Sequence, residues 1–188
     1  GKTTQIAGKM MGQGFLLCNE INPKRAKILS RNIERMAVAN ALVTNEHPAT
    51  LAQRFPDGFV KVLIDAPCSG EGMFRKDEQA VAEWSMGNVI MCVERQRTIL
   101  RDIWHTLKSG GLLIYSTCTF NRFEDEDNAR WICSELGGEL LEERHFLPGR
   151  DRGEGFYCAA IRKSGEGESI DAISVLKDKI VRKANSTL

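Results

Sequence analysis

Residues 60–70, VKVLIDAPCSG, hold the pattern that decides the fold. The apolar run predicts a buried strand, and the Pro and Gly that follow predict a loop carrying Cys68. Residues 111–116, GLLIYS, repeat this form and lead into a second loop around Cys118. Helical patterns separate such runs along the chain. This alternation predicts an α/β fold, a mostly parallel sheet with helices on both faces.

The remaining elements are predicted from apolar periodicity and from residues that typically begin or end helices and strands. Asn22 and Pro23 predict a helix N-terminus, and residues 108–111 (KSGG) predict a C-cap and turn after a long helix. Two late strands are expected to form an antiparallel edge. The expected strands are 14–20, 41–45, 60–65, 111–116, 139–142 and 155–162, and the expected helices are 22–40, 88–107 and 124–136.

Length and composition predict one domain with a short appendage. The chain has 188 residues, 42% of them hydrophobic and 27% charged, as in ordinary globular proteins. From Lys163 the sequence turns polar, and a last helix is expected at 170–181. No apolar run approaches the roughly 20 residues of a membrane span. The net charge of +1 gives no global field, so a nucleic-acid partner would need local basic patches.

The six cysteines divide into two groups. They form no CxxC pair and have no His at zinc spacing, so no metal site is expected. Free thiols are typical of a reducing, cytoplasmic setting. Cys68 and Cys118 lie in polar turns beyond strand ends, where a lowered thiol pKa would favour a nucleophile. The others, inside strands or helices, are expected to be buried hydrophobic residues: Cys18, Cys92, Cys133 and Cys158.

Ligands of doubly wound sheets bind at the carboxyl ends of the strands. Glu20, Asp65, Cys68 and Cys118 all follow predicted strands there. A carboxylate in the position of Glu20 can accept ribose hydroxyls, but it can equally cap the next helix or pair with Lys24. Residues 1–4, GKTT, are similar to the end of a phosphate-binding loop.

Three motifs carry a resemblance to a known family, and they lie at residues 65–76 (DAPCSGEGMFRK), 115–120 (YSTCTF) and 153–157 (GEGFY). The chain resembles the Sun-domain family of RNA 5-methylcytosine methyltransferases, in particular its bacterial ribosomal-RNA branch. The resemblance implies a Rossmann-like S-adenosylmethionine-dependent methyltransferase fold. It makes residues 1–163 a catalytic domain that lacks the family's first strand and N-terminal part, and residues 164–188 a polar linker and helix toward a further domain.

The resemblance also implies residue roles. Cys118 would attack carbon 6 of cytosine, and Cys68 would help to release the enzyme after methyl transfer. Asp65 would lie near the ring and the cofactor.

The cofactor, S-adenosylmethionine, would be held by Gly1, Lys2, Glu20 and Asp65. Asn45 would contact the adenine, with Glu46 or His47 as alternatives.

The RNA, expected to be ribosomal, would meet Arg75 and Lys76, because these residues directly follow the Cys68 loop. Arg31 and Arg35 are more typical of a solvated helix face. DNA cytosine methylation is disfavoured, since a second Thr-Cys loop such as that of Cys118 is not expected there. An inactive fragment or a non-catalytic RNA-binding module of the same fold remains the alternative. The sequence gives no oligomeric state.

Overall fold

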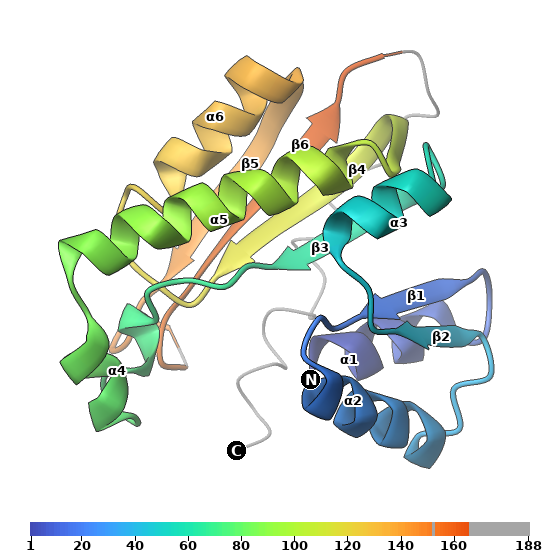
Figure 1. Cartoon of the computed structure of the whole chain (residues 1–188), viewed down its shortest axis with the longest axis horizontal. Coiled ribbons are helices and arrows are strands. Elements are labelled where there is room, and N and C mark those ends of the chain that lie inside the picture. The colour runs from blue at the N-terminus through green and yellow to red at the C-terminus, as the bar shows by residue number, and fades with distance from the viewer. Residues whose placement is uncertain (152, 166–188) are drawn as a thin grey trace.

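The computed structural model describes residues 1–151 and 153–165, and it has the α/β alternation predicted (Figure 1). Most of the predicted linker, with the expected helix at 170–181, lies outside the described residues. The elements are α1 Lys2–Met10, β1 Leu16–Asn19, α2 Pro23–Arg35, β2 Ala41–Thr44, α3 Pro48–Arg54, β3 Phe59–Asp65, η1 Glu71–Met73, α4 Glu78–Glu83, α5 Met86–Trp104, β4 Leu107–Thr117, α6 Glu126–Leu136, β5 Gly138–Phe146 and β6 Phe156–Lys163.

The strands form a mixed arrangement rather than a mostly parallel sheet. β1 pairs with β2 in a two-stranded parallel sheet, and the four-stranded sheet has the order β3-β4-β6-β5. β3 and β4 are parallel, whereas β6 runs antiparallel to both β4 and β5. The predicted antiparallel edge is therefore confirmed. It also makes the larger sheet mixed, because two of its three pairings involve β6.

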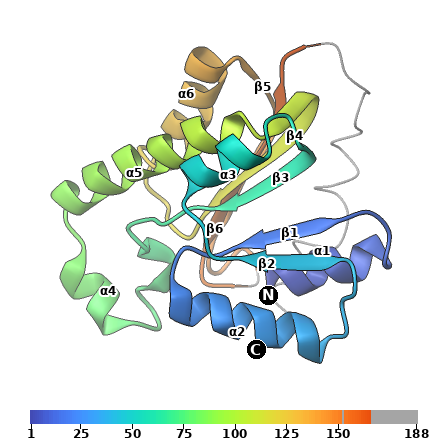
Figure 2. The same ribbon diagram turned by 45° about the vertical axis from the view of Figure 1, so that its right-hand side comes forward.

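Helices cover both sides of the strands, as predicted. Figures 1 and 2 show α3, α5 and α6 on one side and α1 and α2 on the other, next to β1 and β2. The main core lies between α5, α6 and the four-stranded sheet. Its fully buried side chains include Leu100, Leu107, Tyr115, Ile132, Tyr157 and Ile161. Among the described residues, no helix has the length and apolar character needed to cross a membrane.

The helix α2 begins as predicted but ends early. The Asn22 side chain accepts hydrogen bonds from the backbone amides of Lys24 and Arg25, and Pro23 occupies the first turn. The helix stops at Arg35, short of the expected end near residue 40, because Ala37 adopts a left-handed φ of 52°.

The helix α5 also ends before its predicted boundary. It stops at Trp104, and Leu107 pairs with Phe59 as the first residue of β4. Residues 108–111 therefore belong to a strand and are not the predicted C-cap and turn. Helical periodicity continues through Leu107, but pairing with β3 decides the conformation there.

Candidate active site

The two cysteine loops meet at the carboxyl ends of β3 and β4. These strands are parallel, with Asp65 level with Ser116, so the loops that follow them leave the sheet side by side. The Sγ atoms of Cys68 and Cys118 lie 3.1 Å apart, and both side chains are half-buried. The backbone amide of Cys118 also donates to the Cys68 sulfur, at 3.3 Å. The structure thus brings together the two cysteines that sequence analysis singled out.

This contact makes the two thiols unequal. The hydrogen bond between the two thiols lowers the pKa of Cys118 to about 7, and the charge of Lys2 adds to the effect, while burial and Asp65 oppose it. The same hydrogen bond, with burial, raises the pKa of Cys68 above its usual value. Cys118 is therefore the member of the pair that carries the thiolate near neutral pH.

Lys2 and Asp65 form an ion pair beside the cysteines. The Lys2 Nζ atom lies 2.8 Å from Asp65 Oδ2, and it also sits 4.7 Å from the centre of the Phe156 ring. Asp65, the last residue of β3, keeps 60% of its side chain exposed. The N-terminal helix thus places a cation at the strand end that carries the cysteine loop.

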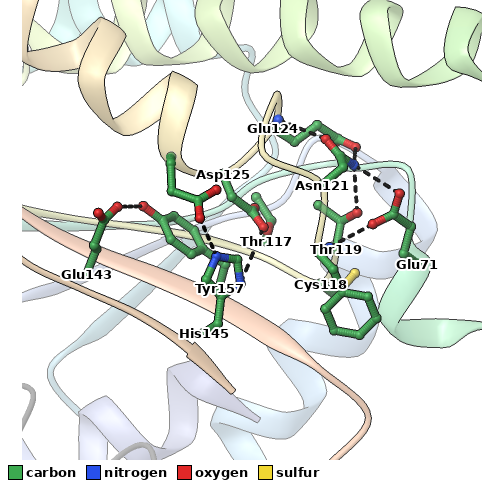
Figure 3. A network of polar contacts seen from close by, with 12 residues as sticks. Glu71, Thr117, Cys118, Thr119, Asn121, Glu124, Asp125, Glu143, His145 and Tyr157 are labelled. Atoms are coloured by element: carbon green, nitrogen blue, oxygen red, sulfur yellow. Dashed lines mark hydrogen bonds and ion pairs between the residues drawn. The ribbon is translucent and has the colours of Figure 1, made fainter. Parts of the chain in front are cut away.

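A network that we call the loop clamp (Ser69, Glu71, Gln96, Asn121 and Glu124) fixes the two loops to each other. Glu124 is fully buried, and its carboxylate accepts hydrogen bonds from Ser69 N at 3.0 Å, Gln96 Nε2 at 2.7 Å and Asn121 Nδ2 at 2.8 Å. Figure 3 shows Asn121 between Glu124 and Glu71. All of these donors are neutral, so each contributes a hydrogen bond without a compensating charge to the buried carboxylate.

Glu71 makes the second half of the clamp. Its carboxylate accepts from Phe120 N at 2.8 Å and from Trp84 Nε1 at 2.9 Å. Burial opposes the ionisation of Glu71, but hydrogen bonds led by that of Phe120 N hold its pKa below the usual value. One ionised side chain from the Cys68 loop therefore anchors the backbone just after Cys118.

Two glycines allow the three sequence motifs to pack together. A Cβ on Gly72 would lie 2.8 Å from Gly155 O and 2.9 Å from Cys118 O, and Gly155 has a φ of 123° with the Phe120 ring against it. Any side chain at either position would push the loops apart. Residues 65–76, 115–120 and 153–157 thus form one site.

Glu20 and Asn45 lie at the ends of β1 and β2. Glu20 accepts from the amide of Asn22 at 3.0 Å and forms an ion pair with Arg25, also at 3.0 Å. Glu20 thus holds the turn before α2, whose N-cap is Asn22, and its ion-pair partner is Arg25 rather than Lys24. Asn45 donates to the backbone oxygens of Glu20 and Ile21 and so fixes this turn.

The alternative adenine contacts have other partners in this structure. His47 caps α3 by accepting from Ala49 N at 3.3 Å, and Glu46 lies 3.8 Å from an Arg54 nitrogen.

Arg75 and Lys76 both face Glu154. Their nitrogens lie 3.7 Å and 3.4 Å from its carboxylate oxygens, and 67% and 42% of their side chains are exposed. Arg31 and Arg35 are exposed, as expected of a solvated face. Any anion that binds Arg75 and Lys76 must therefore compete with Glu154.

Sequence analysis missed a second buried network behind the cysteine loop. The Thr117 hydroxyl donates to Asp125, whose carboxyl is fully buried and has its pKa raised to about 8, by burial first and then by Glu126, Glu124 and Glu71. Figure 3 shows His145 beside Asp125. His145 Nδ1 lies 3.8 Å from Asp125 and its Nε2 lies 2.9 Å from Glu126.

Asp125, Glu126 and His145 offer possible metal-ligand atoms within 4.8 Å of one another. The two ring nitrogens of His145, however, face different carboxylates. This is the arrangement of a hydrogen-bonded imidazole, whose ring is held between two acids, rather than that of a ligand shell around one ion.

The four remaining cysteines are more weakly ionised than Cys118. Cys18, Cys92 and Cys158 are buried, as predicted, with 6%, 5% and 4% exposed, and Cys133 is half-buried. Burial raises the pKa of each of these thiols.

Comparison with known proteins identifies the chain's relatives. The "Ribosomal RNA small subunit methyltransferase F" of Cronobacter sakazakii is 36% identical over 91% of this chain and 39% of its own length. The protein of the same name from Salmonella paratyphi A is 37% identical over 86% of this chain and 38% of its own. The chain thus spans less than two fifths of these relatives.

Solved structures agree with the fold. NSun6 from Pyrococcus horikoshii, solved with the S-adenosylmethionine analogue SFG, is 25% identical, with a TM-score of 0.77 over 88% of this chain and 46% of that one. A methyltransferase homologue from the same organism has a TM-score of 0.76 at 25% identity, over 87% of this chain and 58% of that one. These structures confirm the Rossmann-like methyltransferase fold.

The family described as "16S rRNA methyltransferase RsmB/F" matches residues 1–162, which include both cysteine loops, the loop clamp and all three motifs. The chain belongs to this family of S-adenosylmethionine-dependent methyltransferases.

Proposed function

We propose that residues 1–163 are the catalytic domain of an RNA (cytosine-5) methyltransferase that acts on ribosomal RNA. The observation that carries the proposal is the pair of cysteines from adjacent strand ends, 3.1 Å apart, with Cys118 the more acidic. The names of the Cronobacter and Salmonella relatives support ribosomal RNA as the substrate class. The free cysteines fit a cytoplasmic enzyme.

Carbon 5 of cytosine is a poor nucleophile, so it needs covalent activation. In the proposed reaction the Cys118 thiolate attacks carbon 6, the 5,6 double bond opens, and carbon 5 becomes nucleophilic. After carbon 5 has been methylated, it loses its proton, the bond from Cys118 to carbon 6 breaks, and the ring regains its double bond. Water takes the proton from carbon 5, and Cys68, whose thiol keeps its own proton near neutral pH, assists the release by donating a hydrogen bond to the departing Cys118 thiolate.

The residues present fit S-adenosylmethionine, which would supply the methyl group as an electrophile. A carboxylate has about four acceptor positions. Glu20 uses two of them, for Asn22 N and Arg25, which leaves capacity for two ribose hydroxyls. Gly1, Lys2 and Asp65 would hold the methionine end, and Asn45 would contact the adenine edge.

Arg75 and Lys76 would bind phosphates of the RNA beside the entering nucleotide. Arg75 and Lys76 keep 67% and 42% of their side chains exposed, where solvent screens their ion pairs with Glu154, so a phosphate can compete with that carboxylate. A cytosine in folded RNA must leave its stack to reach Cys118, and the loops at residues 65–76 and 115–120 would receive it.

The activity is tested with the full-length protein that contains this chain, small-subunit ribosomal RNA and labelled S-adenosylmethionine, followed by nucleoside mass spectrometry. The expected product is 5-methylcytidine, and it should be absent with Cys118→Ala and retained with the matched control Cys133→Ala. A folded protein that yields no methylated nucleoside under any condition would favour the alternative, a non-catalytic RNA-binding module.

A further inference from the structure

We propose that Cys118 and Cys68 also form a peroxide-reactive pair, in which Cys118 is oxidised by a hydroperoxide and Cys68 closes a disulfide that blocks the site. The modification itself is a property of the two thiols. The loss of activity that follows from it rests on the function proposed above.

Geometry is the first support. The two sulfurs are 3.1 Å apart, about 1 Å more than the about 2.05 Å of an S–S bond. Ser69 and Glu71 on one loop are hydrogen-bonded to Glu124, Phe120 and Asn121 on the other. Because the clamp holds both loops in place, the thiols stay near each other and only a small approach is needed to join them.

Selectivity among the six cysteines is the second support. Cys68, Cys118 and Cys133 are half-buried, whereas Cys18, Cys92 and Cys158 are buried, and burial raises the pKa of Cys133. Peroxides react with thiolates, and reactivity follows thiolate character and exposure. Cys118 combines a lowered pKa with access, and Cys68 stands beside it where a resolving cysteine is required.

The chemistry balances with hydrogen peroxide as the oxidant. The Cys118 thiolate attacks one peroxide oxygen, an S–O bond forms, the O–O bond breaks and hydroxide leaves, giving a sulfenic acid. The Cys68 sulfur then attacks the Cys118 sulfur, the S–S bond forms, the S–O bond breaks, and water leaves with the proton of Cys68. The hydroxide takes up the proton that Cys118 lost on ionisation, so the two thiols lose two electrons in total and one peroxide becomes two waters.

The disulfide consumes the sulfur that would attack cytosine, so the oxidised enzyme should be inactive. A dithiol reductant reverses the step by thiol–disulfide exchange. The pair would thus link methylation of ribosomal RNA to the peroxide level around the enzyme.

The test uses the reduced full-length protein, treated with hydrogen peroxide, blocked with N-ethylmaleimide and mapped by mass spectrometry without reduction. We expect one linked peptide pair, Cys68 with Cys118, which disappears after dithiothreitol. Cys68→Ser should leave a Cys118 sulfenic acid that dimedone captures, and Cys133→Ser should form the disulfide like the wild type. Thermal unfolding checks that both variants are folded.

The proposal is overturned if the wild type links other cysteines, or if Cys118 passes to sulfinic acid with Cys68 still free. It is also overturned if neither thiol reacts under conditions that oxidise free cysteine. The two proposals fail separately. If the disulfide forms in a protein that has no methyltransferase activity, only the proposed function is wrong. If methylation continues after the disulfide has formed completely, only the regulatory claim is wrong.

Discussion

The Sγ atoms of Cys68 and Cys118 share a hydrogen bond across 3.1 Å, and this contact is the largest influence on the pKa of Cys118, which it lowers to about 7. Lys2 lies 2.8 Å from Asp65 at the end of β3, and its positive charge lowers the pKa of Cys118 further. The roles of the two cysteines can therefore be separated by experiments that read ionisation, stability and covalent chemistry one at a time.

The thiolate of Cys118 should appear at a lower pH than that of a free cysteine. Alkylation of Cys118 by iodoacetamide, followed by mass spectrometry, should reach half its maximal rate near pH 7. Cys68→Ala removes the donor and should move this midpoint toward about 8.5, the value of an unperturbed thiol. Cys68→Ser keeps a donor and serves as the control, with a smaller shift. An identical midpoint in wild type and Cys68→Ala would show that the thiols do not interact.

Removal of the buried carboxylate of the clamp should destabilise the protein. Glu124→Ala leaves Ser69 N without its acceptor, whereas Gln96 Nε2 keeps Pro67 O and Asn121 Nδ2 keeps Glu71 Oε1. An unsatisfied buried group costs about 1 to 3 kcal/mol, so we expect urea denaturation to show a loss of at least about 1 kcal/mol. Glu135→Ala, at an exposed position of α6, should stay within about 0.5 kcal/mol of wild type. Equal stability of all three proteins would mean that the clamp contributes nothing.

Asp125 should make stability fall as pH rises. Its pKa in the folded protein is about 8, above the usual 3.8, so between about pH 4 and 8 the folded state keeps a proton that the unfolded state has lost. The stabilisation is complete below this window and lost above it. Asp125→Asn should make the slope of unfolding free energy against pH less negative, by up to about 1.4 kcal/mol per pH unit for one proton.

Urea denaturation at several pH values measures this slope. Asp127→Asn removes a carboxylate from the same turn, at a more exposed position, and controls for the change in net charge. A slope in Asp125→Asn equal to that of wild type would show that Asp125 is ionised in the folded protein.

Glu20 should bind the cofactor with its free acceptor positions. The ribose would donate two charge-assisted hydrogen bonds, each worth about 1.5 to 3 kcal/mol. We therefore expect Glu20→Ala to weaken the affinity for the cofactor by at least about tenfold. Arg25→Ala is the matched control, because it removes the ion-pair partner but leaves the carboxylate. Titration calorimetry with S-adenosylmethionine on the full-length protein distinguishes them. Equal weakening by both variants would assign Glu20 to the turn alone.

The strand ends of the site could be predicted from sequence, because apolar runs closed by Pro or Gly depend on local chemistry. Asp65 is therefore placed correctly at the end of its strand, and Cys68 and Cys118 on the loops that follow. The end of α5 could not be predicted, since Leu107 fits a helical stripe and becomes a strand only by pairing with Phe59. The sequence also did not predict three short helices, α1, α3 and α4, because their apolar periodicity is weak.

The clamp and the Asp125 network had no signal in the sequence. Gln96 sits in an apolar stripe, and only the fold shows that it bonds Glu124, 28 positions along the chain. His145 reaches Glu126 across 19 positions. Such contacts depend on how β4, β5 and α5 pack, and a single sequence does not specify which polar side chains will meet.

The roles of the cysteines are tested by covalent trapping. If Cys68 acts only after methyl transfer, Cys68→Ala should still attack carbon 6 but fail to release the product. The full-length variant, incubated with S-adenosylmethionine and substrate RNA, should accumulate as a protein–RNA adduct.

A denaturing gel of that reaction tests the roles of the two cysteines most directly. Cys68→Ala should give a slow, nuclease-sensitive band, and Cys118→Ala and the double variant should give none. An adduct formed by Cys118→Ala but not by Cys68→Ala would contradict the assignment and make Cys68 the nucleophile. No adduct from either variant, with full methylation by both, would contradict covalent catalysis altogether.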